Sequence, residues 1–308
     1  MIRYFATRLA WGLPTLFVIL TVAFFLIRMA PGGPFDEEQA LPVEIKRNLD
    51  AAYGLDQPLM VQYGRYLRSV AHGDFGPSFK YKDFTVTELI GQGFPVSAVL
   101  GSVAMALALV VGVSIGVFAA LRHQRFGDHA AMAAAVIGIT VPSFVLLPLL
   151  ALIFGVYLKW LPVAGWEPGS IRHYVLPVVA LALPPMAFIS RLTRSSMIEV
   201  LRSPYIRTAR AKGLPERVVL WRHALRPALI PVAGFLAPAV AAIMTGSLVV
   251  ESISGLPGIG RYLVQGALNR DYTLVMGMVI IYSALLIAMG LLVDLLYAWL
   301  DPRIRYRA

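Results

Sequence analysis

Five residues in the middle of the chain, Gly112–Gly116 (GVSIG), match the G-x-S-x-G pattern that holds the nucleophilic serine of many hydrolases. That chemistry needs a sharp turn from a strand to a helix, with the serine exposed at the turn. Here Ser114 lies inside an unbroken apolar run. The same residues also fit G-x-x-x-G, whose small side chains let two membrane helices approach closely. We therefore expect helix packing here, and a membrane hydrolase is the weakest of the functional hypotheses.

The other chemically capable residues form no recognisable metal or nucleotide site. The sequence has five histidines without an H-E-x-x-H pairing, and it has no cysteine, which excludes a zinc-protease motif and a disulfide framework. It contains no G-x-x-x-x-G-K-[ST] loop, and the glycines of GLPGIG (Gly255–Gly260) have the wrong order for a dinucleotide fingerprint. We expect no catalytic residue, no metal and no cofactor bound by this chain.

The composition is that of a membrane protein. Hydrophobic residues make up 58% of the 308 residues and charged residues only 14%, whereas soluble domains average about 25% charged residues. A membrane span needs roughly 20 apolar residues, and six segments qualify: 9–27, 97–121, 130–157, 175–190, 228–250 and 274–298. The first begins like a signal peptide, but its apolar run is too long and no A-x-A cleavage pattern follows. We predict an all-α integral membrane protein with six transmembrane helices, the first an uncleaved anchor within residues 1–29.

The distribution of basic residues predicts the orientation of these spans. The loops on one side (1–8, 122–129, 191–227 and 299–308) carry 16 basic and 4 acidic residues, and those on the other side carry 11 basic and 12 acidic. Cytoplasmic loops are enriched in lysine and arginine, so we expect both termini in the cytoplasm and the protein in the inner (plasma) membrane. The net charge of +10 thus lies at membrane edges, and we expect no nucleic-acid partner.

The segment 30–95, on the predicted outer side, differs from the spans. Prolines and glycines at 31–34 break the chain, and VEIKRNLDAAYGL and MVQYGRYLRSV have the periodicity of short amphipathic helices. We expect a small ordered helical cap on the outer face.

A cluster of turn-forming residues follows the fifth span on the same side. Gly255, Pro257, Gly258 and Gly260 lie within six residues, which predicts a tight re-entrant bend rather than a helix between the fifth and sixth spans. Irregular backbone at the membrane edge is tolerated only where protein or water covers it. We therefore expect these four residues to line an outer gate.

The spans hold few groups that could couple transport to an ion gradient. Ion-coupled carriers usually bury ionisable residues near mid-membrane, whereas Asp294 lies near the cytoplasmic end of its span, where Arg191 or Arg194 is expected to neutralise it. Arg28, at the outer end of the first span, is expected to snorkel to the interface. A transporter of this kind must obtain its energy from a partner, and a stand-alone ion-coupled secondary transporter is the alternative.

A cationic stretch separates the fourth and fifth spans. Ser203 suits the N-cap of a helix and Pro204 its first position, so a helix is predicted to run from there through Lys212. Gly213 can adopt the left-handed conformation that ends a helix. A second helix is predicted to begin at Pro215, and Pro227 ends or kinks it.

The predicted first helix has two dissimilar sides. Tyr205, Ile206 and Ala209 form a small apolar edge, whereas Arg207 and its cationic neighbours point elsewhere. So short a helix needs a surface to dock on. From the residues alone, that surface is either anionic lipid or a partner protein.

Beyond these patterns, TARAKGLPERVVLWRHALRPALIP resembles the EAA loop of binding-protein-dependent ABC importer permeases. Gly213 matches the glycine of that loop. The segment 207–209 (Arg-Thr-Ala) stands in place of the usual Glu-Ala-Ala, in the form typical of the peptide-transport branch, and 223–226 stands where many members have I-x-L-P.

Three further segments resemble the B-type permease subunit of oligopeptide importers: 72–83 (HGDFGPSFKYKD), 251–272 and 293–306. The likeness covers essentially the whole chain. The first segment, together with the short outer segment 158–174, favours the oligopeptide type over the dipeptide and nickel types.

The resemblance implies an ABC importer (type I) permease fold with its core in 96–308. It implies a heterodimer with a homologous permease, two ATPase subunits that bind ATP and Mg, and an outer peptide-binding protein that largely selects the oligopeptide. It also implies that the EAA loop, about 203–227, docks in a groove of an ATPase subunit. The residues assigned to this coupling are Arg207, Thr208, Ala209, Arg210, Ala211, Lys212, Gly213 and Glu216.

Overall fold

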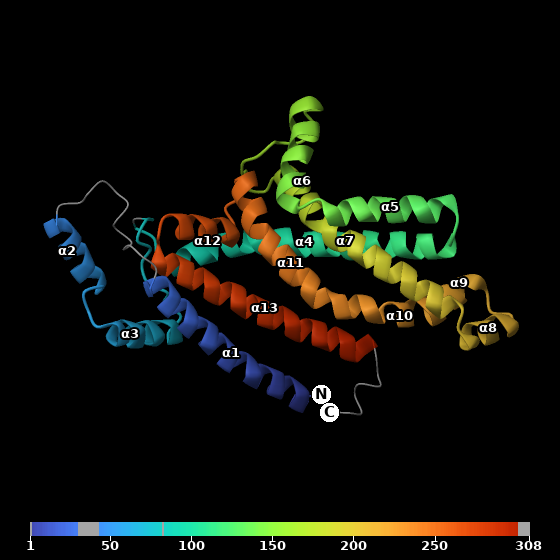
Figure 1. Ribbon diagram of the computed structural model, residues 1–308, viewed down its shortest axis with the longest axis horizontal. Helices are drawn as coiled ribbons and strands as arrows, with labels where there is room; N and C mark the ends of the chain where they lie inside the picture. The colour runs from blue at the N-terminus through green and yellow to red at the C-terminus, as the bar shows by residue number, and fades with distance from the viewer. Residues whose placement is uncertain (1, 30–42, 82, 301–308) are drawn as a thin grey trace. The chain divides into compact units, whose positions relative to one another are not determined.

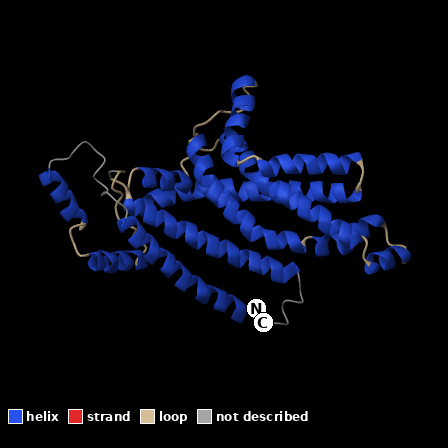
Figure 2. Ribbon diagram, viewed as in Figure 1, coloured by secondary structure: helices blue, strands red, loops and turns tan. Residues whose placement is uncertain are grey.

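The computed structural model describes residues 2–29, 43–81 and 83–300, which are helical apart from turns and connecting loops (Figure 1, Figure 2). Among these residues the only β-pairing is an isolated bridge between Pro77 and Thr85. In chain order the helices are α1 (Ile2–Met29), α2 (Val43–Tyr53), α3 (Leu59–Ala71), α4 (Val86–Leu121), α5 (Phe126–Thr140), α6 (Ser143–Leu150), the π-helix η1 (Ala151–Tyr157), α7 (Arg172–Leu201), α8 (Pro204–Ala211), α9 (Glu216–Val218), the π-helix η2 (Val219–Ala224), α10 (Leu225–Ala228), α11 (Ile230–Ser254), α12 (Ile259–Leu268) and α13 (Tyr272–Leu300). The predicted all-α class is confirmed for this part of the chain.

Five of the described helices, α1, α4, α7, α11 and α13, are long and apolar enough to cross a membrane. The third predicted span is not straight: Phe126–Thr140 and Ser143–Tyr157 meet at an angle of 106°, and α6 leaves the line of α5 steeply in Figure 1. Pro142 lacks an amide hydrogen and disfavours helical geometry at Val141, which is extended at φ −87° and ψ 116°. The described chain has five candidate spans, or six if the bent pair crosses as one, and six spans remain a prediction.

The chain forms two compact units. The first comprises Met1–Leu9, Ala98–Leu256 and Leu286–Ala308, and the second comprises Ala10–Ser97 and Pro257–Leu285. In the first unit, α5, α6 and α11 all pack against α7. This unit therefore has α7 as its central helix.

Helices α4 and α7 approach closely at the GVSIG segment. Cβ atoms added at Gly112 and Gly116 would lie 2.7 and 2.6 Å from backbone carbonyl oxygens of α7, so the predicted packing role of these glycines is confirmed. The Ser114 hydroxyl donates to the carbonyl of Val110 at 2.6 Å, within a continuous helix. The strand-to-helix turn that a hydrolase needs is absent from this segment, and that hypothesis is wrong.

In the second unit, the two predicted amphipathic cap helices form as α2 and α3. The guanidinium of Arg28 bonds the Gln62 side chain of α3, and its Cζ lies 5.3 Å from the ring centre of Phe24 and 5.7 Å from that of Tyr272. The guanidinium of Arg28 is therefore held by α3 and two aromatic rings, and its snorkelling to the interface stays a prediction. The remainder of the predicted cap, residues 30–42, lies outside the described residues, as does Lys82.

The second unit also fixes the 72–83 segment to the start of α13. The fully buried carboxylate of Asp271 accepts hydrogen bonds from the Ser78 hydroxyl and from the amide of Phe79 at 3.1 Å. Its other oxygen accepts the Leu274 amide at 3.1 Å, which caps α13. One carboxylate thus anchors the loop before α4 and caps the start of α13.

Candidate functional site

The cationic stretch forms a short helix at the predicted place. Helix α8 begins at Pro204 and ends at Ala211, with Ser203 at the N-cap in extended conformation. The Ser203 hydroxyl donates to the carbonyl of Val200 at 2.6 Å and makes no capping bond, so Ser203 has the predicted position without the predicted side-chain role. Gly213 has φ +75°, which confirms the left-handed residue that ends the helix and reverses the chain.

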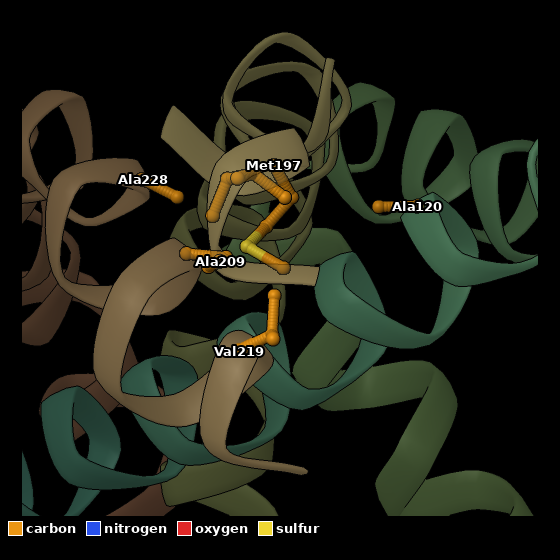
Figure 3. Close-up of a cluster of buried hydrophobic side chains, with 7 residues drawn as sticks. Ala120, Met197, Ala209, Val219 and Ala228 are labelled. Carbon is orange, nitrogen blue, oxygen red and sulfur yellow. The ribbon is translucent and has the colours of Figure 1, made fainter. Parts of the chain in front are cut away.

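One face of α8 is packed against its own chain. Ile206 is fully buried and Ala209 is 7% exposed. They belong to a group of buried side chains, here called the α8 cluster: Ala120, Met197, Ile206, Ala209, Val219, Ala224 and Ala228. Figure 3 shows the Met197 side chain of α7 reaching toward Ala209 and Val219. Ala209 therefore contacts the interior of this chain, a correction to its expected place in a partner's groove.

The opposite side of α8 is exposed to solvent and is here called the exposed face. It comprises Tyr205, Arg207, Thr208 and Ala211, together with the C-cap residue Lys212. Its two cations alternate with small or polar side chains. The expected apolar edge is thus divided, because Ile206 and Ala209 point inward whereas Tyr205 is 46% exposed. The exposed face is the part of α8 available to a partner.

An ion pair closes the turn that follows α8. The guanidinium of Arg210 donates to the Glu216 carboxylate, at 2.6 Å from Nη2 and 3.2 Å from Nε. The hydrogen bond from Arg210 lowers the pKa of Glu216, and the same bond raises the pKa of Arg210. Both side chains are about half exposed, so the pair orients the turn at Gly213 and contributes little to stability.

The predicted second helix forms between α8 and α11, and part of it adopts the wider π-helical geometry. It runs through α9, η2 and α10 and begins after Pro215, as predicted. Pro227 supplies no amide hydrogen and crowds the carbonyl one turn earlier, which favours the wider π geometry in Val219–Ala224. Leu229 then separates α10 from α11, so the predicted interruption of the second helix near Pro227 is confirmed.

The predicted outer bend is only partly a bend. Gly255 ends α11 with φ +73°, and in the first unit the Gly165 amide donates to the carbonyl of Ser254 at 2.7 Å. Contrary to expectation, the chain becomes helical again at Ile259, so Gly260 lies inside α12. The division between the two units falls inside this segment, after Leu256.

The start of α12 belongs to the second unit and packs on α4. A Cβ at Gly93 would lie 3.0 Å from the amide nitrogen of Ile259 and 3.1 Å from the carbonyl carbon of Gly258. The Ile259 amide also donates to the Ser97 hydroxyl at 2.9 Å. Gly258 is buried and has φ −91°, so the left-handed glycine of this motif is Gly255.

Three buried carboxylates, Asp128, Glu251 and Asp271, were not predicted from the sequence. Asp271 follows a turn, and its burial depends on a loop that lies 191 to 193 residues away in sequence. Asp128 was treated only as a loop charge, yet it binds Arg194. Arg194 thus has a partner that was not predicted, and the neutralisation of Asp294 by Arg191 or Arg194 stays a prediction. For Asp128 the available signal was an aspartate in the first turn of a helix, and for Asp271 it was an aspartate directly before a helix. Both indicate only local capping.

The described residues contain no group of three histidine, aspartate or glutamate side chains arranged to hold a metal ion.

Comparison with known proteins identifies the family. Residues 112–306 match the model of the binding-protein-dependent transport system inner membrane component. The chain belongs to this family. It is 52% identical to the oligopeptide transport system permease protein OppB of Salmonella typhimurium (99% of this chain, 100% of the relative). It is 48% identical to the dipeptide transport system permease protein DppB of Bacillus subtilis (99% and 98%).

A solved structure supports the fold of this permease family member. The chain of a crystal structure titled as an amino acid ABC transporter with histidines matches with a TM-score of 0.51 and 18% identity, covering 68% of this chain and 94% of that one. At that identity the match shows the fold alone. The resemblance drawn from the sequence is confirmed, and the chain is a membrane permease component of a transport system rather than an enzyme.

Proposed function

We propose that this permease carries oligopeptides inward as one of two homologous membrane subunits that form a single pathway. Two ATPase subunits on the cytoplasmic side supply the energy with ATP and Mg, and a peptide-binding protein delivers the substrate from outside. The similarity to oligopeptide permeases along almost the entire chain supports this substrate class. The sequence has no phosphate-binding loop of its own, which agrees with hydrolysis on separate subunits.

The observation that carries the proposal is the division of α8 into a buried and an exposed face. Because Ile206 and Ala209 are held in the α8 cluster, the exposed face is presented on a fixed base. A partner that displaces this face therefore also displaces the residues packed against α8, because the close-packed cluster transmits the movement. This is the arrangement that an ATPase-docking helix requires.

The exposed face also gives a test that separates an ATPase groove from a lipid surface. Ala211→Trp adds bulk to a close-packed groove, and overpacking costs about 1–3 kcal/mol, so peptide-stimulated ATP hydrolysis in the reconstituted complex should fall. Ala211→Ser is the matched control and should be silent. Arg207→Ala should act mildly, because exposed ion pairs are worth about 0–1 kcal/mol.

A lipid-bound helix predicts the opposite order. There Ala211→Trp is tolerated, since tryptophan suits the interface, and Arg207→Ala is harmful. That ranking would contradict docking on an ATPase. Ala209→Trp cannot separate the two hypotheses, because Ala209 packs inside its own chain.

The proposal includes six spans with both termini in the cytoplasm. Reporter fusions should place residues 60 and 165 outside and residues 125, 210 and 305 inside. Purification distinguishes the proposal from a stand-alone secondary carrier. This permease should copurify with two P-loop proteins and should not transport peptide without them. Uptake by the isolated chain in an ion gradient would instead favour the carrier.

We also propose that Gly255, Pro257, Gly258 and Gly260 belong to an outer gate near the docked binding protein. Gly258 is buried, so Gly258→Val should reduce uptake while leaving membrane insertion unchanged. Uptake equal to that of the wild type would argue against a gate at this position.

A further inference from the structure

An ion pair between a buried carboxylate and a partly exposed arginine joins three elements of the first unit near α8. Asp128, in the first turn of α5, has no exposed surface. Its carboxylate accepts two hydrogen bonds from Arg194 of α7, at 2.5 Å from Nε and 2.7 Å from Nη2. It also accepts the Gln124 amide at 3.0 Å, and His123 Nδ1 lies 3.4 Å away. The carboxylate thus bonds α7 to both α5 and the turn that precedes it.

The same stretch of α7 is packed against α8. Met197 lies three residues after Arg194 and is fully buried in the α8 cluster. On the α4 side, a Cβ at Gly116 would lie 2.5 Å from Cβ of Thr193, so α7 has no free space in that direction. Because close-packed interiors have low compressibility and transmit strain, a displacement of α8 must carry this part of α7 with it.

At its other end, α5 reaches the bend of 106° between Phe126–Thr140 and Ser143–Tyr157. Pro142 gives no amide hydrogen to the carbonyl of Gly138, so the backbone bonding that stiffens a continuous helix is interrupted there. Hinges are a few residues at the ends of elements that absorb changes in φ and ψ. Val141 and Pro142 occupy such a position.

We propose that Asp128 and Arg194 are positioning residues that pass movement of α8 through α7 into α5 and its bend. In this way, closure of the ATPase on α8 reaches the part of the chain that lies in the membrane. The inference rests on the proposed docking of α8 and adds the route within this chain.

The chemistry of the Asp128–Arg194 pair suits a role in coupling the movements of α7 and α5 better than a role in simply holding them together. Burying the Asp128 carboxylate is costly, and well-packed apolar side chains often hold two elements at least as firmly. A two-donor arginine–carboxylate bond adds a fixed relative orientation of its two groups. Helix α5 therefore follows a rotation of α7 as well as a translation, which apolar contact alone does not enforce.

The test measures labelled oligopeptide transported per ATP hydrolysed by the complete complex in proteoliposomes. Asp128→Asn keeps the size and removes the charge, and Arg194→Lys keeps the charge and removes the two-donor geometry. Each should lower the ratio about fivefold or more, within the range of coupling energies between sites. The double variant should fall no further than the worse single variant, because the two residues act as one link. His129→Asn, at the adjacent exposed position, is the matched control and should leave the ratio unchanged.

The outcomes distinguish the possible failures. An unchanged transport ratio in a correctly assembled Asp128→Asn complex overturns the link, and a loss of thermal stability without a change in ratio assigns the pair a structural role only. Wild-type transport that does not depend on the ATPase contradicts the proposed function instead. If neither variant assembles, hydrogen exchange of residues 124–130 in the wild-type complex decides: protection there should change when the complex is held in its ATP-bound state, and unchanged exchange overturns the proposal.

Discussion

The contact between α4 and α7 predicts a specific cost for adding one methyl group at Gly116. An added Cβ would lie 2.5 Å from Cβ of Thr193 and 2.6 Å from the carbonyl oxygen of Ser190. That oxygen is backbone and cannot rotate away, so the two helices must separate. Overpacking of this kind costs about 1–3 kcal/mol. Gly116→Ala should therefore destabilise the permease.

The same substitution elsewhere on α4 provides the control. At Gly101 the added Cβ would lie 3.7 Å from the Ile243 side chain, an ordinary contact. Both substitutions gain the same helix propensity, about 1 kcal/mol for alanine over glycine, so that gain cancels in the comparison. The difference between Gly116→Ala and Gly101→Ala is then the steric term alone.

The assay is thermal unfolding of the purified permease in detergent, supported by its amount in membranes. A change of 1 kcal/mol lowers the melting temperature of a chain of 150–250 residues by roughly 2–4 °C. We expect Gly116→Ala to melt several degrees below Gly101→Ala. Equal melting temperatures would refute close packing at this contact.

Three further predictions concern single residues. Gly213→Val should lower the free energy of unfolding by about 1–2 kcal/mol because of the left-handed backbone at this position. Nothing lies within 4 Å of the added Cβ, so no steric clash contributes. Gly213→Asn should lower the melting temperature less, because asparagine tolerates this conformation better. Arg210 lowers the pKa of Glu216, so this carboxylate stabilises the fold at neutral pH and ceases to do so only as pH falls through the lowered pKa. Glu216→Gln should therefore lower the free energy of unfolding by about 0–1 kcal/mol at pH 7. It should also reduce the loss of stability that accompanies a fall in pH, and an unchanged loss would contradict the pairing of Glu216 with Arg210. Asp271→Ala should cost about 1–3 kcal/mol for each buried donor it leaves unpaired, and a melting temperature equal to that of the wild type would argue against its anchoring of Ser78.

Features set by local chemistry can be predicted from the sequence. The ends of α8 follow from Pro204 and Gly213, whose backbone preferences act without any distant partner. The amphipathic cap helices follow from periodicity in the same way. The start of α4 could also have been predicted, because Thr85 and Glu88 form a reciprocal capping box. The helix begins at Val86, eleven residues before the predicted span.

Other features depend on residues far apart in the chain. Asp128 and Arg194 are 66 residues apart, and no local pattern pairs them. A proline also does not by itself predict where a helix bends: Pro142 separates α5 from α6, whereas Pro177, Pro184 and Pro185 all lie within the continuous helix α7. The inward orientation of Ala209 required knowing that Met197 of α7 covers it.

The two faces of α8 place neighbouring residues under different evolutionary constraints. Ile206 and Ala209 are constrained by the interior of their own chain, so replacing them alters the fold before it alters any partner. Arg207, Thr208 and Ala211 are exposed and can diverge without disturbing that interior. Under the proposed docking of an ATPase on α8, a lineage can therefore change which ATPase it accepts by substitutions on one side of this short helix. Hybrid importers are then best constructed by exchanging that side alone.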